Sequence, residues 1–440
     1  MKRTSTRFAL FELLLLVKIA AAAVTFTDIA ASTNLLSPEL LEKTWTVTAV
    51  NIDKLEIQVA GNVFVDYDDS LQSDAQVSAK VVMRASSAKL LDTVGVTDIG
   101  VDTDAGVRLH YKNQQLHVEG LVTTQILLSK PNTLRAISTA NTQNVVLGDN
   151  VVLDNKAARL HFSTHGNGHM FIGTSASFDV RSMGIVVSGD GGIQFQSSSL
   201  KVAEEVVVSL VGAGHVAVIA EDSFVANKVE SAVAGTGEVV VQASGLQVET
   251  IATEIVGNGE VTYATEGACG SEKIRLAGEG SVNAASIVCK NADVSILGIG
   301  EVVLQATERL STTLLLTGSV NYVNARPKSI QSSGLVLESS IKQAQATPLV
   351  QYSPLSPPNR AATGVFLTVE AANNDDSPYI HVRPVVATAI RLQNLSASLP
   401  ESMSALVLFE VAIGAMAFVA LSVFKFQQRR IRNKYQTLLP

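Results

Sequence analysis

Aromatic side chains are scarce in this 440-residue chain: they make up 5% of the residues, although 47% of the residues are hydrophobic. The apolar side chains are therefore mainly Val, Ala, Leu and Ile, a composition that favours long β-structure in thin layers. Charged residues are also few, at 17%, and 33 Lys and Arg against 40 Asp and Glu leave a net charge of −7. This balance argues against a nucleic-acid partner, which would require a basic patch.

Proline is absent from residues 132–326, so nothing in this tract interrupts the hydrogen-bond ladder of a sheet. Glycine recurs there as a Gly-x-Gly pair, with steps of 20 to 23 residues between the first glycines. These first glycines are Gly166, Gly189, Gly212, Gly235, Gly257, Gly278 and Gly298, and Gly318 continues the second column. A fixed period of this length is the signature of a stacked repeat architecture.

The residues after each glycine pair alternate between apolar and mixed positions. The fourth position after the first glycine is apolar in every repeat and includes Val239, Val261, Val282 and Val302. Such alternation predicts a strand with one buried face, which stacked copies can bury together. One position further on, Val240 and Val303 are expected to point outward into solvent.

We therefore predict an all-β chain in which residues 151–330 form a parallel β-helix, with coils about 4.8 Å apart. Residues 44–150 are expected to form an N-terminal β region of the same domain. An antiparallel sandwich is the alternative, but its hairpins would not require a glycine column in register.

The same residues resemble a domain family found mainly in bacterial surface proteins. The tract 46–149 looks like the opening of the auto-transporter adhesin head domain, or GIN domain, through Leu55–Val59, Leu116–Val118 and Ser129–Pro131. The Gly-x-Gly-x-Val turns from Gly166 to Val320 are similar to the signature of that family, so the resemblance covers residues 46–324. It implies a right-handed parallel β-helix and, through the family name, adhesion. It implies no functional residues.

Both ends of the chain predict membrane targeting. Residues 1–23 combine a basic start, an apolar run and an Ala-rich end, which predicts a cleaved signal peptide; an uncleaved anchor is the alternative. Residues 405–424 are apolar over the length that crosses a bilayer, and the basic tail 425–440 places the C-terminus in the cytoplasm. We expect a single-pass type I protein of the cell membrane or an endomembrane, with its large N-terminal part extracellular or lumenal.

Residues 331–404 contain seven of the eleven prolines and are rich in Ser and Thr. This composition predicts a semi-extended extracellular stalk, in which Phe366–Val369 could add a strand to the rod. Asn394 begins an Asn-Leu-Ser glycosylation sequon near the predicted membrane surface. In the tail, Tyr435 and Leu438 fit a tyrosine-based sorting motif.

Cysteine occurs only at Cys269 and Cys289, each nine residues before the first glycine of a pair. The two residues therefore share one column on consecutive coils, about 4.8 Å apart. That separation suits a disulfide, and an extracellular location favours oxidation. We predict a disulfide, with two stacked buried thiols as the alternative. Two cysteines alone are too few ligands for a metal site.

Other polar groupings have simpler explanations than catalysis or metal binding. His165 and His169 flank a Gly-Asn-Gly turn and are expected to be exposed turn residues. A column of stacked carboxylates is expected to form a solvated face instead of a Ca²⁺ ladder; it contains Glu238, Glu260 and Glu301. The remaining acidic clusters lie outside the glycine repeats and are expected in turns or loops; they are Asp66, Asp68, Asp69, Asp375 and Asp376. No catalytic residue, metal or cofactor is therefore predicted.

These features favour a non-enzymatic cell-surface protein that binds an extracellular ligand, either a glycan or another protein, and acts in adhesion. A membrane-tethered carbohydrate-active enzyme is the first alternative, and it would require two or three carboxylates in a cleft on one face of the rod. A structural spacer or coat protein without a specific ligand is the second.

Overall fold

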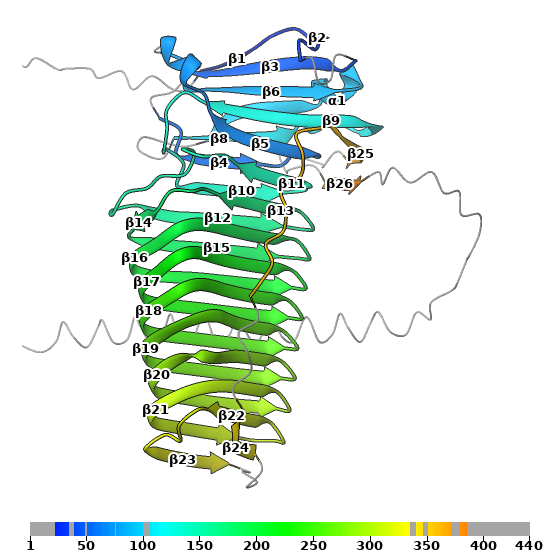
Figure 1. Cartoon of the computed structure of the whole chain (residues 1–440). Helices are drawn as coiled ribbons and strands as arrows, with labels where there is room; N and C mark the ends of the chain where they lie inside the picture. The colour runs from blue at the N-terminus through cyan, green and yellow to red at the C-terminus, as the bar shows by residue number, and fades with distance from the viewer. Residues whose placement is uncertain are drawn as a thin grey trace, which may run out of the picture.

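The computed structural model describes residues 23–34, 39–48, 51–74, 76–99, 105–334, 340–345, 351–370 and 379–384. Within these ranges almost all of the chain is strand, stacked into the long solenoid of Figure 1. The helical segments among these residues are two short ones, η1 (Asp69–Ser73) and α1 (Ala88–Asp92). The predicted all-β solenoid is therefore confirmed.

Each of the long strands in the middle of the rod makes nearly one complete coil. These strands are β16 (Gly192–Gly212), β17 (His215–Gly235), β18 (Glu238–Gly257), β19 (Glu260–Gly278), β20 (Ser281–Gly298) and β21 (Glu301–Leu314). Consecutive coils pair in parallel, and the register shifts where the chain bends. In β18 these bends separate face A (Glu238–Ala243), face B (Leu246–Val248) and face C (Thr250–Gly257), and we use the same names on the other coils.

The two glycine columns have different physical reasons. Gly257, in the first column, has φ +116°, a conformation that residues with a Cβ atom rarely adopt. Gly280, in the second column, lies so close to the previous coil that a Cβ atom would come within 2.5 Å of the Gly259 carbonyl oxygen. The turn therefore needs glycine once for its backbone angle and once for the close approach of the coils.

The N-terminal end of the rod is covered by antiparallel strands. These are β1 (Ala23–Phe26), β2 (Ala30–Ala31), β3 (Leu41–Thr48), β6 (Ala79–Ala85), β7 (Val94–Ile99), β8 (Gly106–Tyr111) and β9 (Leu116–Leu128). Strand β9 pairs antiparallel with β6 and parallel with β5 (Asn62–Tyr67). Face A of the solenoid therefore continues into this N-terminal cap as one sheet.

Shorter strands complete the solenoid at both ends. On the cap side they are β4 (Lys54–Ile57), β10 (Ala136–Ala140), β11 (Asn144–Leu147), β12 (Arg159–His165), β13 (His169–Gly173), β14 (Phe178–Val180) and β15 (Ser182–Ser188). At the far end they are β22 (Ser319–Val323), β23 (Ser329–Gly334) and β24 (Ile341–Ala344). All of them pair in parallel with the coils beside them.

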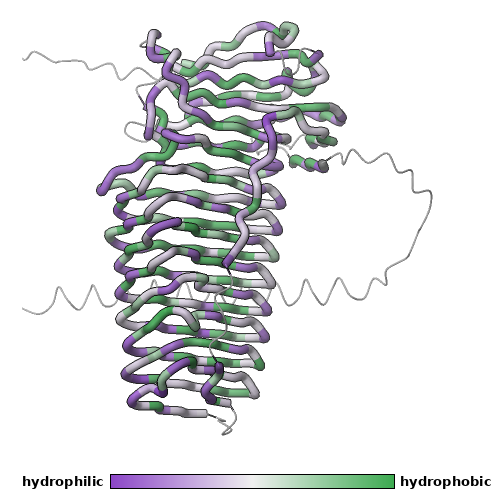
Figure 2. Tube along the Cα trace, in the orientation of Figure 1, coloured by the Kyte–Doolittle hydropathy of each residue, from purple (hydrophilic) through white to green (hydrophobic). Residues whose placement is uncertain are grey.

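The core is a continuous apolar column inside the coils. The predicted inner register is confirmed, because Val239 pairs with Val261, Val261 with Val282, and Val282 with Val302. All four side chains are at most 1% exposed. Figure 2 shows hydrophobic and hydrophilic positions alternating along the coils, as a strand with one buried face requires.

After the last coil the chain returns to the N-terminal cap. Strand β25 (Thr363–Glu370) pairs antiparallel with β9, and β26 (Tyr379–Pro384) pairs antiparallel with β25. Figure 1 shows the segment before β25 running up the side of the rod. The sequence predicts a stalk over 331–404, but the parts of this range that the structure describes lie against the rod, because Val365, Leu367 and Val369 are buried in its core.

No helix among the described residues is long and apolar enough to cross a membrane. The predicted signal peptide 1–23 lies outside the described residues except for Ala23, and the predicted span 405–424 and tail 425–440 lie wholly outside them.

Candidate functional site

A Pro-rich segment, residues 351–362, crosses face A along the axis of the rod; we call it the strap. The backbone N–H of Tyr352 donates to Gln242 Oε1 at 2.6 Å. The Gln194 side chain accepts from Leu355 N at 2.8 Å and donates to Leu355 O at 3.1 Å. One glutamine thus satisfies both backbone groups of a strap residue, as a neighbouring strand would.

The spacing of these contacts follows from the geometry of the two partners. Pro354, Pro357 and Pro358 favour the polyproline conformation, which rises about 3.1 Å per residue. From Tyr352 to Leu355 the strap would therefore advance about 9 Å. The two glutamines that it contacts lie two coils apart, which is about 10 Å at the usual strand spacing. An extended Pro-rich segment consequently stays in register with side chains on every second coil.

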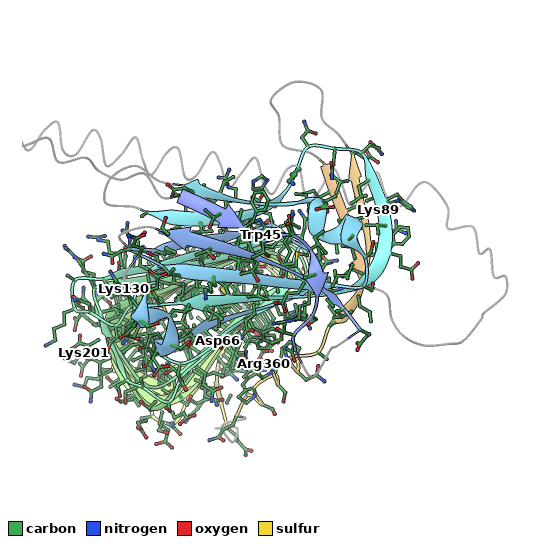
Figure 3. All side chains as sticks on the ribbon, turned by 90° about the horizontal axis from the view of Figure 1, so that it is seen from above. Trp45, Asp66, Lys89, Lys130, Lys201 and Arg360 are labelled. Atoms are coloured by element: carbon green, nitrogen blue, oxygen red, sulfur yellow. A yellow bond between two sulfur atoms is a disulfide. The ribbon has the colours of Figure 1, made fainter. Side chains whose placement is uncertain are left out.

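An ion pair fixes the end of the strap that lies next to the cap. Arg360 donates to both carboxylate oxygens of Asp66 on β5, at 2.6 and 2.7 Å, and its guanidinium lies 5.1 Å from the centre of the Phe64 ring. In Figure 3 Asp66 and Arg360 lie side by side. Bidentate pairs of this kind are stronger and more directional than single hydrogen bonds.

The strap changes the environment of face A. The sequence predicts that Val240 faces solvent, and this prediction is wrong, because Val240 is 2% exposed. Ala217 and Ile219, on the outer side of the preceding coil, are also buried, and Tyr352 stacks on His215 with ring centres 5.1 Å apart. The outward-pointing side chains of face A are therefore buried on the coils next to the strap. Val303, which points outward on a later coil, is only half-buried.

A cleft of about 570 Å³ opens where β26 overhangs the glycine turns of the first coils. We call it the turn cleft. Its polar lining residues include Asn141, Asn144, Asn167, His169, His381 and Arg383. Residues more than 200 positions apart in the sequence thus meet in one cleft, and they do so because the strap and β25 bring β26 back to the cap.

The wall of the turn cleft on the solenoid side is held by hydrogen bonds between amides. Asn144 Nδ2 donates to Asn62 Oδ1 at 2.9 Å, on two strands that pair in register. Gln143 Nε2 donates to the backbone oxygen of Gly364 on β25 at 3.4 Å, which joins this wall to the returning chain. Asn141 has φ 60° and, like Asn167, an exposed side chain. The cleft therefore combines the hydrogen-bonded amides of Gln143 and Asn144 with those of Asn141 and Asn167, which make no hydrogen bond to the described residues.

The histidines of the Gly-Asn-Gly turn differ in their surroundings. His165 is exposed, as predicted, but His169 is half-buried in the turn cleft. Burial, and to a lesser extent the neighbouring His215, lowers the pKa of His169. His169 is therefore neutral at neutral pH and offers one donor and one acceptor.

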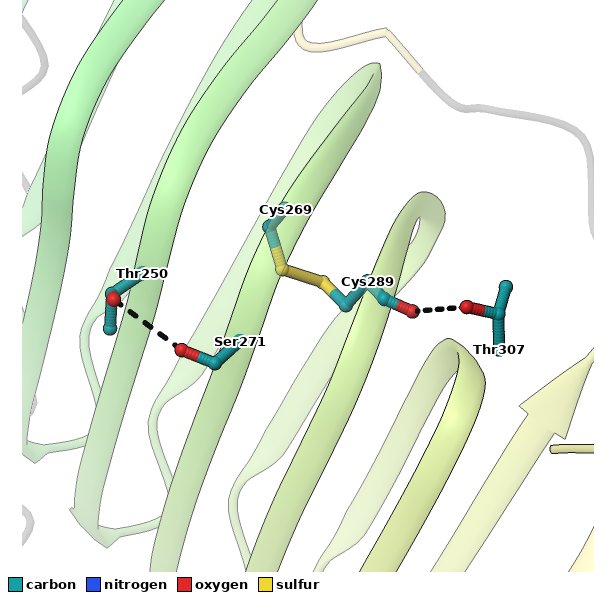
Figure 4. Close-up of a disulfide and its surroundings, with 5 residues drawn as sticks. All are labelled: Thr250, Cys269, Ser271, Cys289 and Thr307. Carbon is teal, nitrogen blue, oxygen red and sulfur yellow. Dashed lines mark hydrogen bonds between the residues drawn. A yellow bond between two sulfur atoms is a disulfide. The ribbon is translucent and has the colours of Figure 1, made fainter. Parts of the chain in front are cut away.

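Inside the rod, Cys269 and Cys289 form a disulfide between β19 and β20 (Figure 4). Their Cα atoms are 4.4 Å apart and the two residues pair in register, as stacking in one column requires. Both side chains are buried, at 5% and 0% exposure. The bond therefore joins two consecutive coils at face B and does not form part of a ligand site.

One buried carboxyl lies close to the disulfide in sequence. Glu272 on β19 pairs in register with Ile251 and Ala292, and its side chain is 2% exposed. Neither carboxyl oxygen has a hydrogen-bond partner among the described residues. Burial raises the pKa of Glu272 to about 8. Because the rod encloses this group, it bears on stability and not on ligand binding.

The remaining predicted groupings do not come together as a site. Glu238 pairs with Glu260 and Ser281 with Glu301 along an exposed column, and no group of acidic, His or Cys side chains among the described residues could hold a metal ion. Asp66 pairs with Arg360, and Asp68 caps η1 through Ser70 N. Several predicted residues lie outside the described part of the chain: Asp375, Asp376, Asn394, Tyr435 and Leu438.

A family model described as "Putative auto-transporter adhesin, head GIN domain" matches residues 224–325, from within β17 to just beyond β22. This part of the chain matches the GIN-domain family. The resemblance drawn from the Gly-x-Gly turns is thereby confirmed over the matched residues. No curated protein matches the chain.

Three solved bacterial structures are similar to this chain. A "putative lipid binding protein" from Parabacteroides distasonis is 13% identical, with a TM-score of 0.34 over 73% of this chain and 96% of its own. A "putative adhesin" from the same species is 12% identical, with a TM-score of 0.34 over 69% and 97%. A "putative adhesin" from Parabacteroides merdae is 11% identical, with a TM-score of 0.32 over 69% and 96%.

The turn cleft was not predictable from local patterns, because β26 reaches the turns only through long-range pairing. One signal for the strap was present in the sequence. Ala217, Ile219 and Val240 are apolar at positions that alternate with the core, and a solvated face would be more polar there.

Proposed function

We propose that this chain is a membrane-anchored, cell-surface binding protein of the adhesin type, whose solenoid presents the turn cleft to an extracellular ligand. The cleft is the observation that supports binding, since its volume of about 570 Å³ lies in the range of ligand sites. The match of residues 224–325 to an adhesin head domain supports the biological role. Membrane attachment is supported by the apolar run 405–424 and the cations after it.

The cleft favours binding over catalysis on carbohydrate. Glycoside hydrolysis usually needs two carboxylates flanking the scissile bond, whereas the described residues that line the turn cleft include neither Asp nor Glu. A spacer protein, the other alternative, would have no need for a cleft assembled from residues far apart in the sequence.

Blocking the cleft tests the proposal. The Gly-x-Gly turns offer a matched pair, because Asn167 and Asn258 are both exposed central residues of such turns and only Asn167 lines the cleft. A fragment of residues 24–404 should bind a glycan array or the surface of cultured cells. Asn167→Trp should reduce that binding at least tenfold, and Asn258→Trp should leave it unchanged. Equal binding by the two variants would place the ligand elsewhere on the rod.

The topology has its own test. Protease added to intact cells should remove an epitope tag placed before Val24 and spare a tag after Pro440. Protection of the first tag and loss of the second would overturn the orientation.

A further inference from the structure

The charge of the turn cleft is opposite to that of the chain. The whole protein has a net charge of −7, but the charged side chain among the described cleft residues is that of Arg383, accompanied by His169 and His381. His381 and Arg383 are two positions apart on β26, so both side chains point to one face of the strand. Both are exposed.

Within the described part of the chain, the guanidinium of Arg383 has no partner. Its side chain makes no ion pair or hydrogen bond with the residues that the structure describes. Arg383 on β26 pairs with Phe366 on β25, and Phe366 pairs in turn with Glu119 on β9. Glu119, the nearest acid on that face of the sheet, is therefore two strands away from Arg383. Two acids on face A nearer the cap have partners of their own, since Asp66 is engaged by Arg360 and Glu238 lies 3.4 Å from His215 Nδ1. The fork of donors on Arg383 is therefore available to a ligand.

A free guanidinium selects a ligand with an oxyanion, because its planar fork matches a carboxylate or a sulfate. The amides and imidazoles beside it suit a different part of the ligand. Asn141 and Asn167 each offer both donors and an acceptor, and neutral His169 offers one of each. Several neutral donors and acceptors next to one cation fit a ligand that has one charge and many hydroxyl groups.

We propose that the turn cleft binds the acidic sugar of a glycan, with its carboxylate or sulfate on Arg383 and its hydroxyl groups on the amides of Asn141 and Asn167. This inference rests on the proposed binding function and names the ligand class for that site. Ile380 and Val382 would contact the less polar face of the ring, since they are half-buried in the lining.

The test uses the full-length protein in detergent and four soluble probes: 3′-sialyllactose, a glucuronic acid disaccharide, 6-sulfo-lactose and lactose. At least one acidic probe should bind tenfold or more tightly than lactose, and the three acidic probes distinguish carboxylate from sulfate. Arg383→Gln should abolish this preference, and Arg383→Lys should keep part of it because the charge remains. Arg275→Gln is the control, since Arg275 is exposed on face C of β19, away from the cleft.

Three outcomes would overturn the inference: no probe binds, lactose binds as well as its acidic analogues, or Arg383→Gln keeps the preference. Binding to vesicles that contain phosphatidylglycerol, without binding to any acidic sugar, would also overturn it and assign the cleft to lipid phosphate. An adhesion assay on cultured cells separates this inference from the proposed function. If the wild-type protein and Arg383→Gln adhere equally, adhesion stands and the acidic-sugar site falls. If an acidic sugar binds but the protein does not mediate adhesion, the site stands and the proposed function falls.

Discussion

Replacing Glu272 by Gln should stabilise the rod increasingly as the pH rises from 5 to 8 and leave it little changed in acid. The carboxyl group lies inside the solenoid between Ile251 and Ala292, without a hydrogen-bond partner among the described residues. Burial raises its pKa from 4.5 to about 8 in the folded chain. The folded state therefore keeps a proton that the unfolded chain releases.

The sign of the effect follows from this difference. Below pH 4.5 the carboxyl group is protonated in both states, and the fold has its full stability. As the pH rises towards 8 the unfolded chain releases this proton while the folded chain keeps it, so the free energy of unfolding falls. Each pH unit in that window costs about 1.4 kcal/mol. Between pH 5 and pH 8 the wild-type rod should therefore lose about 3.5 kcal/mol relative to Glu272→Gln, somewhat less than three full units, because a group with a folded-state pKa of about 8 is half-ionised at pH 8.

Urea unfolding of residues 23–384 at pH 5, 6, 7 and 8 measures this difference. The control is Glu260→Gln, which makes the same chemical change at an exposed position of the same strand, β19. The stability of the control relative to wild type should not depend on pH. If Glu272→Gln follows the wild-type pH profile, then Glu272 is ionised inside the rod or reached by water, and the reasoning is refuted.

Three further substitutions test the layers of the rod. Val240→Asp should destabilise it by about 1–3 kcal/mol, more than Val303→Asp does, because Val240 is buried and Val303 is only half-buried; thermal unfolding of both variants compares them. Changing Cys269 and Cys289 together to Ala opens a loop with a sequence separation of 20 and should cost about 3 kcal/mol, and dithiothreitol should lower the melting temperature of the wild type but not of the variant. Arg360→Ala should lower the free energy of unfolding by less than about 1 kcal/mol, since the ion pair with Asp66 is partly exposed. It should nevertheless make the strap more sensitive to limited proteolysis. A digestion rate equal to that of the wild type would show that this ion pair does not hold the strap.

The solenoid was predictable because its information is local. Each coil repeats the same sequence features within 20 to 23 residues. These are glycine at the turn, alternating apolar residues on face A, and a small residue at the end of that face. Copies of a short pattern reinforce one another, so the inner register of Val261 and the pairing of Cys269 with Cys289 follow by counting.

The strap and the turn cleft were less predictable because they depend on contacts between distant residues. Gln194 recognises the backbone of Leu355, and any residue but proline would present the same N–H and C=O groups. The proline content of 351–362 indicated an extended segment, but an extended segment can be solvated as easily as docked. Arg383 reaches the turn at Asn167 only because β25 pairs with β9, which no local period encodes.

The return of the chain to its own beginning also decides which end of the rod a membrane would hold. Strand β26 ends at Pro384, beside the N-terminal cap, and twenty residues, 385–404, separate it from the apolar run 405–424. Even fully extended, those residues span at most about 70 Å. If that run anchors the chain, the point at which the linker leaves the folded part is the cap, next to the turn cleft, and not β23 at the last coil. A bilayer anchor and the cleft would then be joined by one short segment of chain, whereas the far tip of the solenoid would have no direct connection to the anchor.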